Sequence, residues 1–162
     1  MIFQASITLH VLAAMFWLGG MLFLALVGAP ALRRIEPPTL RARLFDDLGT
    51  RFRTAGWIAV AILLLTGLYN LRYHGVLDWS VLRQGAFWRT GFGTARAGKL
   101  ASVVVLLALQ AVHDFILGPR ASAAPAGSPE AVRLRRRAAL LARLNALVAL
   151  VLVIAAVRLP RT

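Results

Sequence analysis

A histidine lies inside the long apolar segment with which the chain begins. His10 is followed by Trp17, about two helical turns later and so on the same face, and then by Gly19 and Gly20. An ionisable side chain in an apolar membrane segment needs a polar partner and is a candidate for function. Glycines let a flat group or another helix approach closely. His10 is therefore either a ligand for a metal or cofactor, or a histidine hydrogen-bonded to a neighbouring helix.

The composition of the chain indicates a membrane protein. Of its 162 residues 59% are hydrophobic, the net charge is +13, and the mean hydropathy is +0.73. Such a chain is too apolar for a soluble domain, whereas apolar spans joined by arginine-rich loops explain both values. The same loops account for the charge, so no nucleic-acid partner is expected. The lack of cysteine excludes disulfides and thiolate metal sites.

Four apolar runs predict an all-α fold, an integral membrane four-helix bundle that forms one transmembrane domain over residues 1–162. The expected spans are about 2–28, 54–72, 95–118 and 138–158. The first run is too long for the apolar part of a signal peptide and has no basic residue before it, so we expect a retained helix. Pro30 and the pair Gly118-Pro119 are expected to end the first and third spans.

The segment after the first span has its own helical pattern. Leu40, Leu44 and Leu48 recur every four residues, with charged residues between them. This pattern predicts a short amphipathic helix on the membrane surface, or equally a helical extension that leads into the second span. Arginines are concentrated here and before the fourth span. The positive-inside rule therefore places these two loops in the cytoplasm and both termini outside, with anionic lipid head groups as partners of the arginines.

Depth in the membrane limits which residues share a site with His10. With 1.5 Å of rise per residue, Lys99 and His74 lie nearer to the depth of His10 than His113 does. Lys99 is then a second ligand or a lysine whose amine reaches the outer interface. His74 reaches the site only if its loop folds inward. His113 is an interfacial polar residue or, more specifically, part of a second ligand site or a proton relay.

Other polar residues of the last two spans are expected to face the bundle interior. Lys99, Ser102, Gln110 and His113 fall on one stripe of the third span, and polar groups avoid lipid. Asn145 is the interior polar residue of the fourth span and is expected to hydrogen-bond to a neighbouring helix. The six acidic residues are assigned to loops and helix ends, so a catalytic carboxylate pair is not expected.

Several short motifs resemble a known family. His10, Trp17 and Gly20 look like the opening helix of CopD-like (copper resistance protein D) membrane proteins, and the helix is also similar to that of HemJ-type haem-binding membrane proteins. Arg51-Phe52-Arg53 leading to Leu65-Thr66-Gly67-Leu68 resembles the second CopD-like helix. Gly98-Lys99-Leu100 resembles the lysine-led third helix of both groups.

The resemblance implies a bacterial inner-membrane protein. HemJ-type proteins imply b-type haem, with His10 and Lys99 in the positions of the important histidine and lysine, while CopD-like proteins imply copper passage or tolerance. Trp17 and Gly20 would pack beside the haem. We therefore expect haem b bound through His10 for electron transfer or a redox step, which includes a haem-dependent oxidoreductase. The alternatives are copper transport and a structural subunit of a homo-oligomer or larger membrane complex.

Overall fold

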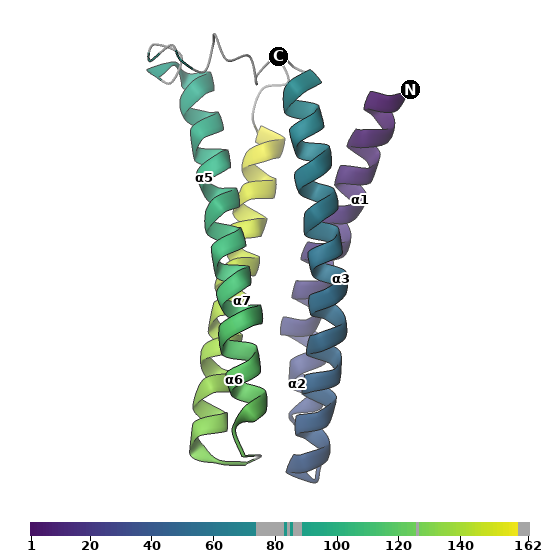
Figure 1. The fold of residues 1–162 in the computed structure, drawn as a ribbon, viewed down its shortest axis with the longest axis vertical. Coiled ribbons are helices and arrows are strands. Elements are labelled where there is room, and N and C mark those ends of the chain that lie inside the picture. The colour runs from purple at the N-terminus through teal and green to yellow at the C-terminus, as the bar shows by residue number, and fades with distance from the viewer. Residues whose placement is uncertain (74–82, 84, 86–88, 126, 159–162) are drawn as a thin grey trace.

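The computed structural model describes residues 1–73, 83, 85, 89–125 and 127–158, and this part of the chain is helical throughout its long segments (Figure 1). In chain order the elements are α1 (Ile2–Phe23), η1 (Leu24–Gly28), α2 (Ala29–Leu32), α3 (Pro38–Tyr73), α5 (Gly91–Val112), η3 (His113–Leu117), α6 (Gly118–Ala123) and α7 (Pro129–Arg158). Four helical segments are long and apolar enough to cross a membrane. The prediction of an all-α, four-span membrane bundle is thus confirmed.

The first and third spans continue through the prolines that were expected to end them. In each span a five-residue π-helix precedes the proline: η1 lies before Pro30 and η3 before Pro119. Each proline then falls at the first or second position of the next α-helical piece, where its missing N–H is not needed. The expectation that Pro30 and Gly118-Pro119 terminate these helices is therefore wrong, because the π turn shifts the hydrogen bonds past the proline.

The charged segment after the first span is the beginning of α3 rather than a separate surface helix. Residues 38–53 run without a break into the second span, and the whole helix has 36 residues. Its length is about 54 Å, well beyond the ~30 Å of a bilayer core. The second of the two sequence-based alternatives, a helical extension, describes this segment.

The bundle consists of two helical hairpins that pack side by side (Figure 1). Hairpin one is α1–η1–α2 with α3, and hairpin two is α5–η3–α6 with α7. The hairpins meet chiefly where α1 contacts α7. Trp17, Met21, Val60, Leu106 and Ala149 belong to the buried core at this junction. The core therefore lies between the hairpins at mid-length.

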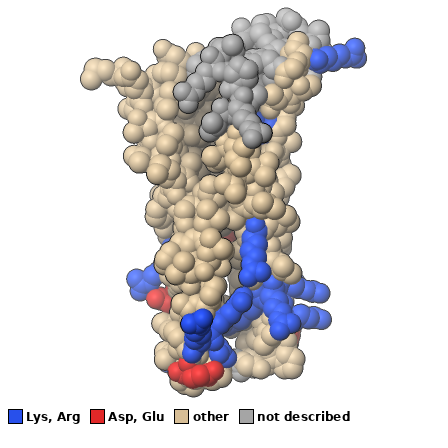
Figure 2. Space-filling view, turned by 180° about the vertical axis from the view of Figure 1, so that it is seen from behind, with Lys and Arg blue, Asp and Glu red and all other residues tan. Residues whose placement is uncertain are grey.

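Basic residues are concentrated at one end of the bundle, where α2 finishes and α3 begins (Figure 2). We call this the arginine-rich end, and the opposite end, where α1 starts and α7 finishes, the N-terminal end. On α3, no charged residue lies between Arg53 and Arg72, a stretch of about 27 Å. These two arginines mark the approximate limits of the apolar band.

The two hairpins have the same construction. Both α1 and α5 contain 22 residues, and both are followed by a five-residue π-helix and a proline. A shift of 89 positions, from Ile2 to Gly91, superposes these boundaries. Buried residues correspond as well: Trp17 matches Leu106 and Met21 matches Gln110. The structure thus contains an internal repeat, which the sequence analysis did not find because few identical residues share these positions.

Candidate functional site

His10 lies on the face of α1 that packs against α3, in the half of the bundle near the N-terminal end. Its Nδ1 is 2.8 Å from the hydroxyl oxygen of Thr66 on α3. The same hydroxyl lies 2.6 Å from the backbone carbonyl of Ile62, one turn earlier, and donates its proton to that oxygen. One turn above, Ser6 on α1 donates to the side-chain oxygen of Asn70 at 3.0 Å. These two contacts fix α1 on α3 around the imidazole.

The hydrogen bonds of Thr66 fit one tautomer of the His10 ring. When the hydroxyl proton is given to Ile62, the Thr66 oxygen accepts from His10. In this tautomer Nδ1 carries the ring proton and Nε2 keeps a free lone pair. This is the arrangement of a metal-ligating histidine, in which a hydrogen bond from one ring nitrogen orients the other as the ligand.

The glycines near His10 serve helix packing. A Cβ at Gly67, the residue after Thr66, would lie 3.4 Å from Cε1 of His10, an ordinary packing distance, so the imidazole lies directly against this glycine. A Cβ at Gly20 would overlap the ring of Phe52 on α3, whereas one at Gly19 would meet nothing within 4 Å. Gly20 thus lets α1 approach α3 closely, and the space beside it is filled by Phe52.

Trp17 is buried in the junction between the hairpins, with 7% of its surface exposed. Its indole Nε1 is buried and has no hydrogen-bond acceptor within the described residues. The edge of this indole faces Gly56 on α3, where a Cβ would lie 3.8 Å from Nε1. Trp17 therefore packs in the core and carries an unused donor about 10 Å along α1 from His10.

Lys99 is an exposed residue of α5, on the hairpin opposite His10. No hydrogen bond joins Lys99 to the imidazole of His10. Lys99 also occupies the position in the second repeat that His10 occupies in the first, 89 residues earlier. His74, the other residue considered near this end, lies outside the described residues.

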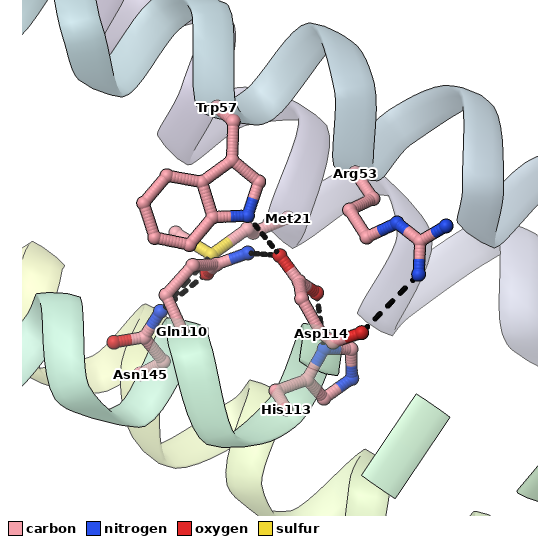
Figure 3. A network of polar contacts seen from close by, with 7 residues as sticks. All are labelled: Met21, Arg53, Trp57, Gln110, His113, Asp114 and Asn145. Atoms are coloured by element: carbon pink, nitrogen blue, oxygen red, sulfur yellow. Dashed lines mark hydrogen bonds and ion pairs between the residues drawn. The ribbon is translucent and has the colours of Figure 1, made fainter. Parts of the chain in front are cut away.

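A second polar centre surrounds Asp114 in η3 (Figure 3). The sequence pointed to His113, Gln110 and Asn145 as polar residues here, but not to the buried carboxylate at the middle of the centre. Asp114 was assigned to a helix end, but it lies within the third span with 6% of its surface exposed. Its Oδ2 accepts from Trp57 Nε1 at 2.9 Å and from Gln110 Nε2 at 2.6 Å, and its Oδ1 is 2.8 Å from His113 Nδ1. Arg53 donates to the backbone carbonyl of Asp114 at 3.2 Å.

Asn145 extends this centre to α7 and α1. Its amide nitrogen donates to Gln110 Oε1 at 2.8 Å and lies 3.8 Å from the sulfur of Met21. Asn145 is 2% exposed, and its Oδ1 has no donor within the described residues. The prediction that Asn145 hydrogen-bonds to a neighbouring helix is confirmed. The predicted stripe is only partly interior, because Gln110 is buried whereas Lys99 is exposed and Ser102 bonds to its own helix at Gly98.

The two polar centres interrupt the repeat at different places. His10 on α1 corresponds to Lys99 on α5, and Met21 on α1 corresponds to Gln110 on α5. The contacts of His10 with Thr66 and of Gln110 with Asn145 therefore involve different positions of the repeat.

Soft metal ligands do not converge in the structure. Met21 is buried beside Asn145, while Met15 is 66% exposed on the outside of α1. Within the described residues no group of three or more histidine, cysteine, aspartate or glutamate side chains is placed to hold a metal ion. The described residues thus bring together neither these two methionines nor three such ligands.

Comparison with known proteins identifies the family. A family model described as copper resistance protein D (CopD) matches residues 47–159. The chain belongs to the CopD family. An uncharacterized protein of Aquifex aeolicus (strain VF5) is 36% identical over 114 residues, which span 70% of this chain and 68% of that protein. No solved structure matches the chain.

The CopD resemblance proposed from short motifs is thus confirmed, and the chain is a multi-pass membrane protein of this family. The matched region contains Thr66, Lys99 and Asp114 but begins after α1. His10, Trp17 and Gly20 lie outside it. The case for His10 as a site residue therefore rests on its contacts with Thr66.

Proposed function

We propose that this CopD-family chain binds b-type haem through Nε2 of His10 and takes part in electron transfer. The observation that carries the proposal is the hydrogen bond from His10 Nδ1 to Thr66, which holds the ring proton on Nδ1 and leaves Nε2 free to bind iron. A neutral imidazole so oriented is the common axial ligand of haem in helical bundles.

The residues around His10 fit such a group. Thr66 holds the imidazole in place, and Gly67 packs beside it. Lys99 offers a cation or a second ligand from the other hairpin. The haem would supply one-electron redox chemistry near the N-terminal end. The chain would orient the imidazole of His10 and keep water from one side of the haem.

Copper handling is the second candidate, and it is favoured by the description of the family. It is less well supported, because Met15 and Met21 lie on different sides of α1 and Met21 is held in the core by Asn145. A purely structural role in a larger complex would leave His10 as a packing residue. The three candidates predict different contents of the purified protein: haem, copper, or neither.

The test is an absorbance spectrum of the protein purified in mild detergent after expression with added haem precursor, recorded oxidised and reduced, together with metal analysis. We expect a Soret band with reduced b-type bands in the wild type, and their loss in His10→Gln. His113→Gln is the matched control, since His113 lies in the same kind of apolar sequence at the other end of the bundle. This control should keep the wild-type spectrum.

Three outcomes would contradict the proposal. A wild-type protein without a Soret band, but with stoichiometric copper that is lost in His10→Gln, would favour copper handling. A protein with neither haem nor copper would favour a structural role. Equal loss of haem in the His10 and His113 variants would show that binding depends on the general stability of the bundle.

A further inference from the structure

Two hydrogen bonds from fixed donors occupy one carboxylate oxygen of Asp114. Trp57 Nε1 can only donate, and Gln110 presents its amide nitrogen because its oxygen accepts from Asn145. Oδ2 of Asp114 therefore accepts two hydrogen bonds and has no room for a proton. A carboxylate with several donors of this kind is stabilised in its ionised form.

The other carboxylate oxygen faces a group that can exchange a proton. Oδ1 of Asp114 is 2.8 Å from Nδ1 of His113. With Asp114 ionised, Nδ1 carries the ring proton and Nε2 of a neutral His113 is bare. The His113 side chain is 32% exposed, whereas that of Asp114 is 6% exposed. His113 therefore connects a buried anion to the surroundings of the bundle.

The pair lies at the level of the arginine-rich end. Arg53, the first charged residue below the apolar band of α3, donates to the carbonyl of Asp114. The residues that the other helices contribute to this network are uncharged: Gln110 on α5, Asn145 on α7 and Met21 on α1. Arg53, Asp114 and His113 are thus the charged or titratable members, and His113 is the one whose ring can change charge without breaking the bonds to Trp57 and Gln110.

We propose that His113 and Asp114 form a proton-exchange site that takes up a proton from the arginine-rich end of the bundle. The proton binds to Nε2 of His113 and converts the neutral ring to an imidazolium that remains hydrogen-bonded to Oδ1 of Asp114. Transfer of the Nδ1 proton to Oδ1 then leaves a neutral acid beside a neutral ring. Either form contains one proton more than the starting pair, and no other bond is made or broken.

The proposal is independent of a cofactor at His10, because His10 lies near the start of α1, at the N-terminal end, whereas His113 follows the last residue of α5, toward the arginine-rich end. The π-helix η3 supports the proposal, because π-helices are frequent at functional sites and this one begins with His113 itself. The equivalent π-helix of hairpin one, η1, contains only apolar residues and glycine. The charged pair is thus not required for making this helical turn.

The experiment is ¹⁵N NMR of the histidine rings in the full-length protein, in lipid nanodiscs, between pH 9 and pH 5. The chain has three histidines, so the variants His10→Gln and His74→Gln assign the signals. We expect His113 at pH 9 to be neutral with its proton on Nδ1, and to gain one proton on Nε2 as the pH falls. A ring that keeps its proton on Nε2 throughout, or is doubly protonated already at pH 9 and does not change, would overturn the proposal.

Asp114→Asn provides a second readout. Its amide oxygen must still accept from Trp57 and Gln110, so its NH₂ group faces His113 and forces Nδ1 to accept. The neutral ring should then carry its proton on Nε2, which is the opposite tautomer. Asp47→Asn, which removes an exposed carboxylate paired with Arg51, is the control and should leave His113 as in the wild type. An unchanged tautomer in Asp114→Asn would count against the site, and the wild-type titration decides the question if that variant does not fold.

Discussion

His10 and His113 are both histidines in apolar sequence, but their Nδ1 atoms have different partners. A neutral hydroxyl accepts from His10, whereas a carboxylate accepts from His113. A hydroxyl orients the ring without favouring a positive charge, and this suits a neutral metal ligand. A carboxylate can accept from Nδ1 of either the neutral or the protonated ring, and this suits a group that exchanges a proton. The partner atom thus separates the two proposed roles more clearly than the residue type does.

Thr66 gives a direct test of the ligand role of His10. Thr66→Val keeps the shape of the side chain but removes the oxygen that accepts from Nδ1. We expect haem binding to weaken by roughly 10–100-fold, as is usual when the partner of a ligating histidine is lost. Haem titration of the apoprotein, followed by absorbance, measures the effect.

Thr66→Ser is the matched variant, because it retains the hydroxyl and should bind haem nearly as well as the wild type. Comparable weakening in both variants would mean that the methyl group, and therefore packing of α3, matters more than the hydrogen bond. Undiminished binding by Thr66→Val would remove the support that this contact gives to His10 as a ligand.

Two neighbouring glycines of α1 differ in what lies opposite them. Gly20 faces the ring of Phe52, and Gly19 faces open space. Gly20→Ala should therefore destabilise the bundle by about 1–3 kcal/mol, because the added methyl group overpacks the interface. Gly19→Ala should be neutral or stabilise the helix by up to about 1 kcal/mol. Reversible unfolding in mixed detergent micelles measures both.

Phe52→Leu in the Gly20→Ala background should recover part of the loss, because it removes ring atoms from the overlap. Recovery of this kind assigns the effect to the α1–α3 interface. If Gly19→Ala and Gly20→Ala are equally harmful, the glycines act through backbone flexibility and not through the distance between these helices.

The π-helices η1 and η3 explain how prolines lie within continuous helical rods. Each π turn shifts the hydrogen-bonding pattern by one residue, as seen in the bond from the N–H of Gly118 to the carbonyl of His113. The proline that follows then begins a new α-helical piece. In hairpin two this turn also brings Asp114 into the interior, where Trp57 and Gln110 reach it.

The two-hairpin arrangement places both ends of the spanning region, the start of α1 and the finish of α7, at the same end of the molecule (Figure 1). Arginines are concentrated at the opposite end (Figure 2). The positive-inside rule then predicts that the arginine-rich end faces the cytoplasm and interacts with anionic lipid head groups.

This orientation can be tested by labelling single cysteines, because the chain has none of its own. Gln4→Cys at the N-terminal end and Glu130→Cys at the start of α7 are both exposed positions. In spheroplasts, a membrane-impermeant maleimide should label Gln4→Cys at once and Glu130→Cys only after the membrane is opened. The reverse order would invert the predicted topology, and labelling of both in intact spheroplasts would argue against a single orientation.

The sequence supported accurate expectations where the physical cause is local. Runs of about 20 apolar residues predict spans whatever surrounds them. The start of α7 is likewise local in origin, because Ser128 Oγ accepts from Ala131 N at 3.1 Å. Expectations failed where one helix depends on another. Asp114 was expected at a helix end. Its three side-chain donors come from positions 57, 110 and 113, and the sequence shows no motif that reveals their meeting at this carboxylate.

The sequence by itself determined the class of the protein, its four spans, its family and the unusual position of His10, because hydropathy, charge and short motifs follow from neighbours along the chain. The tertiary structure alone decided which groups meet. It set Thr66 against His10, gathered Trp57, Gln110 and Asn145 around Asp114, and matched the two hairpins. These contacts arise from helix rotation and crossing, which are set by packing between distant segments and by the π turns that shift their register.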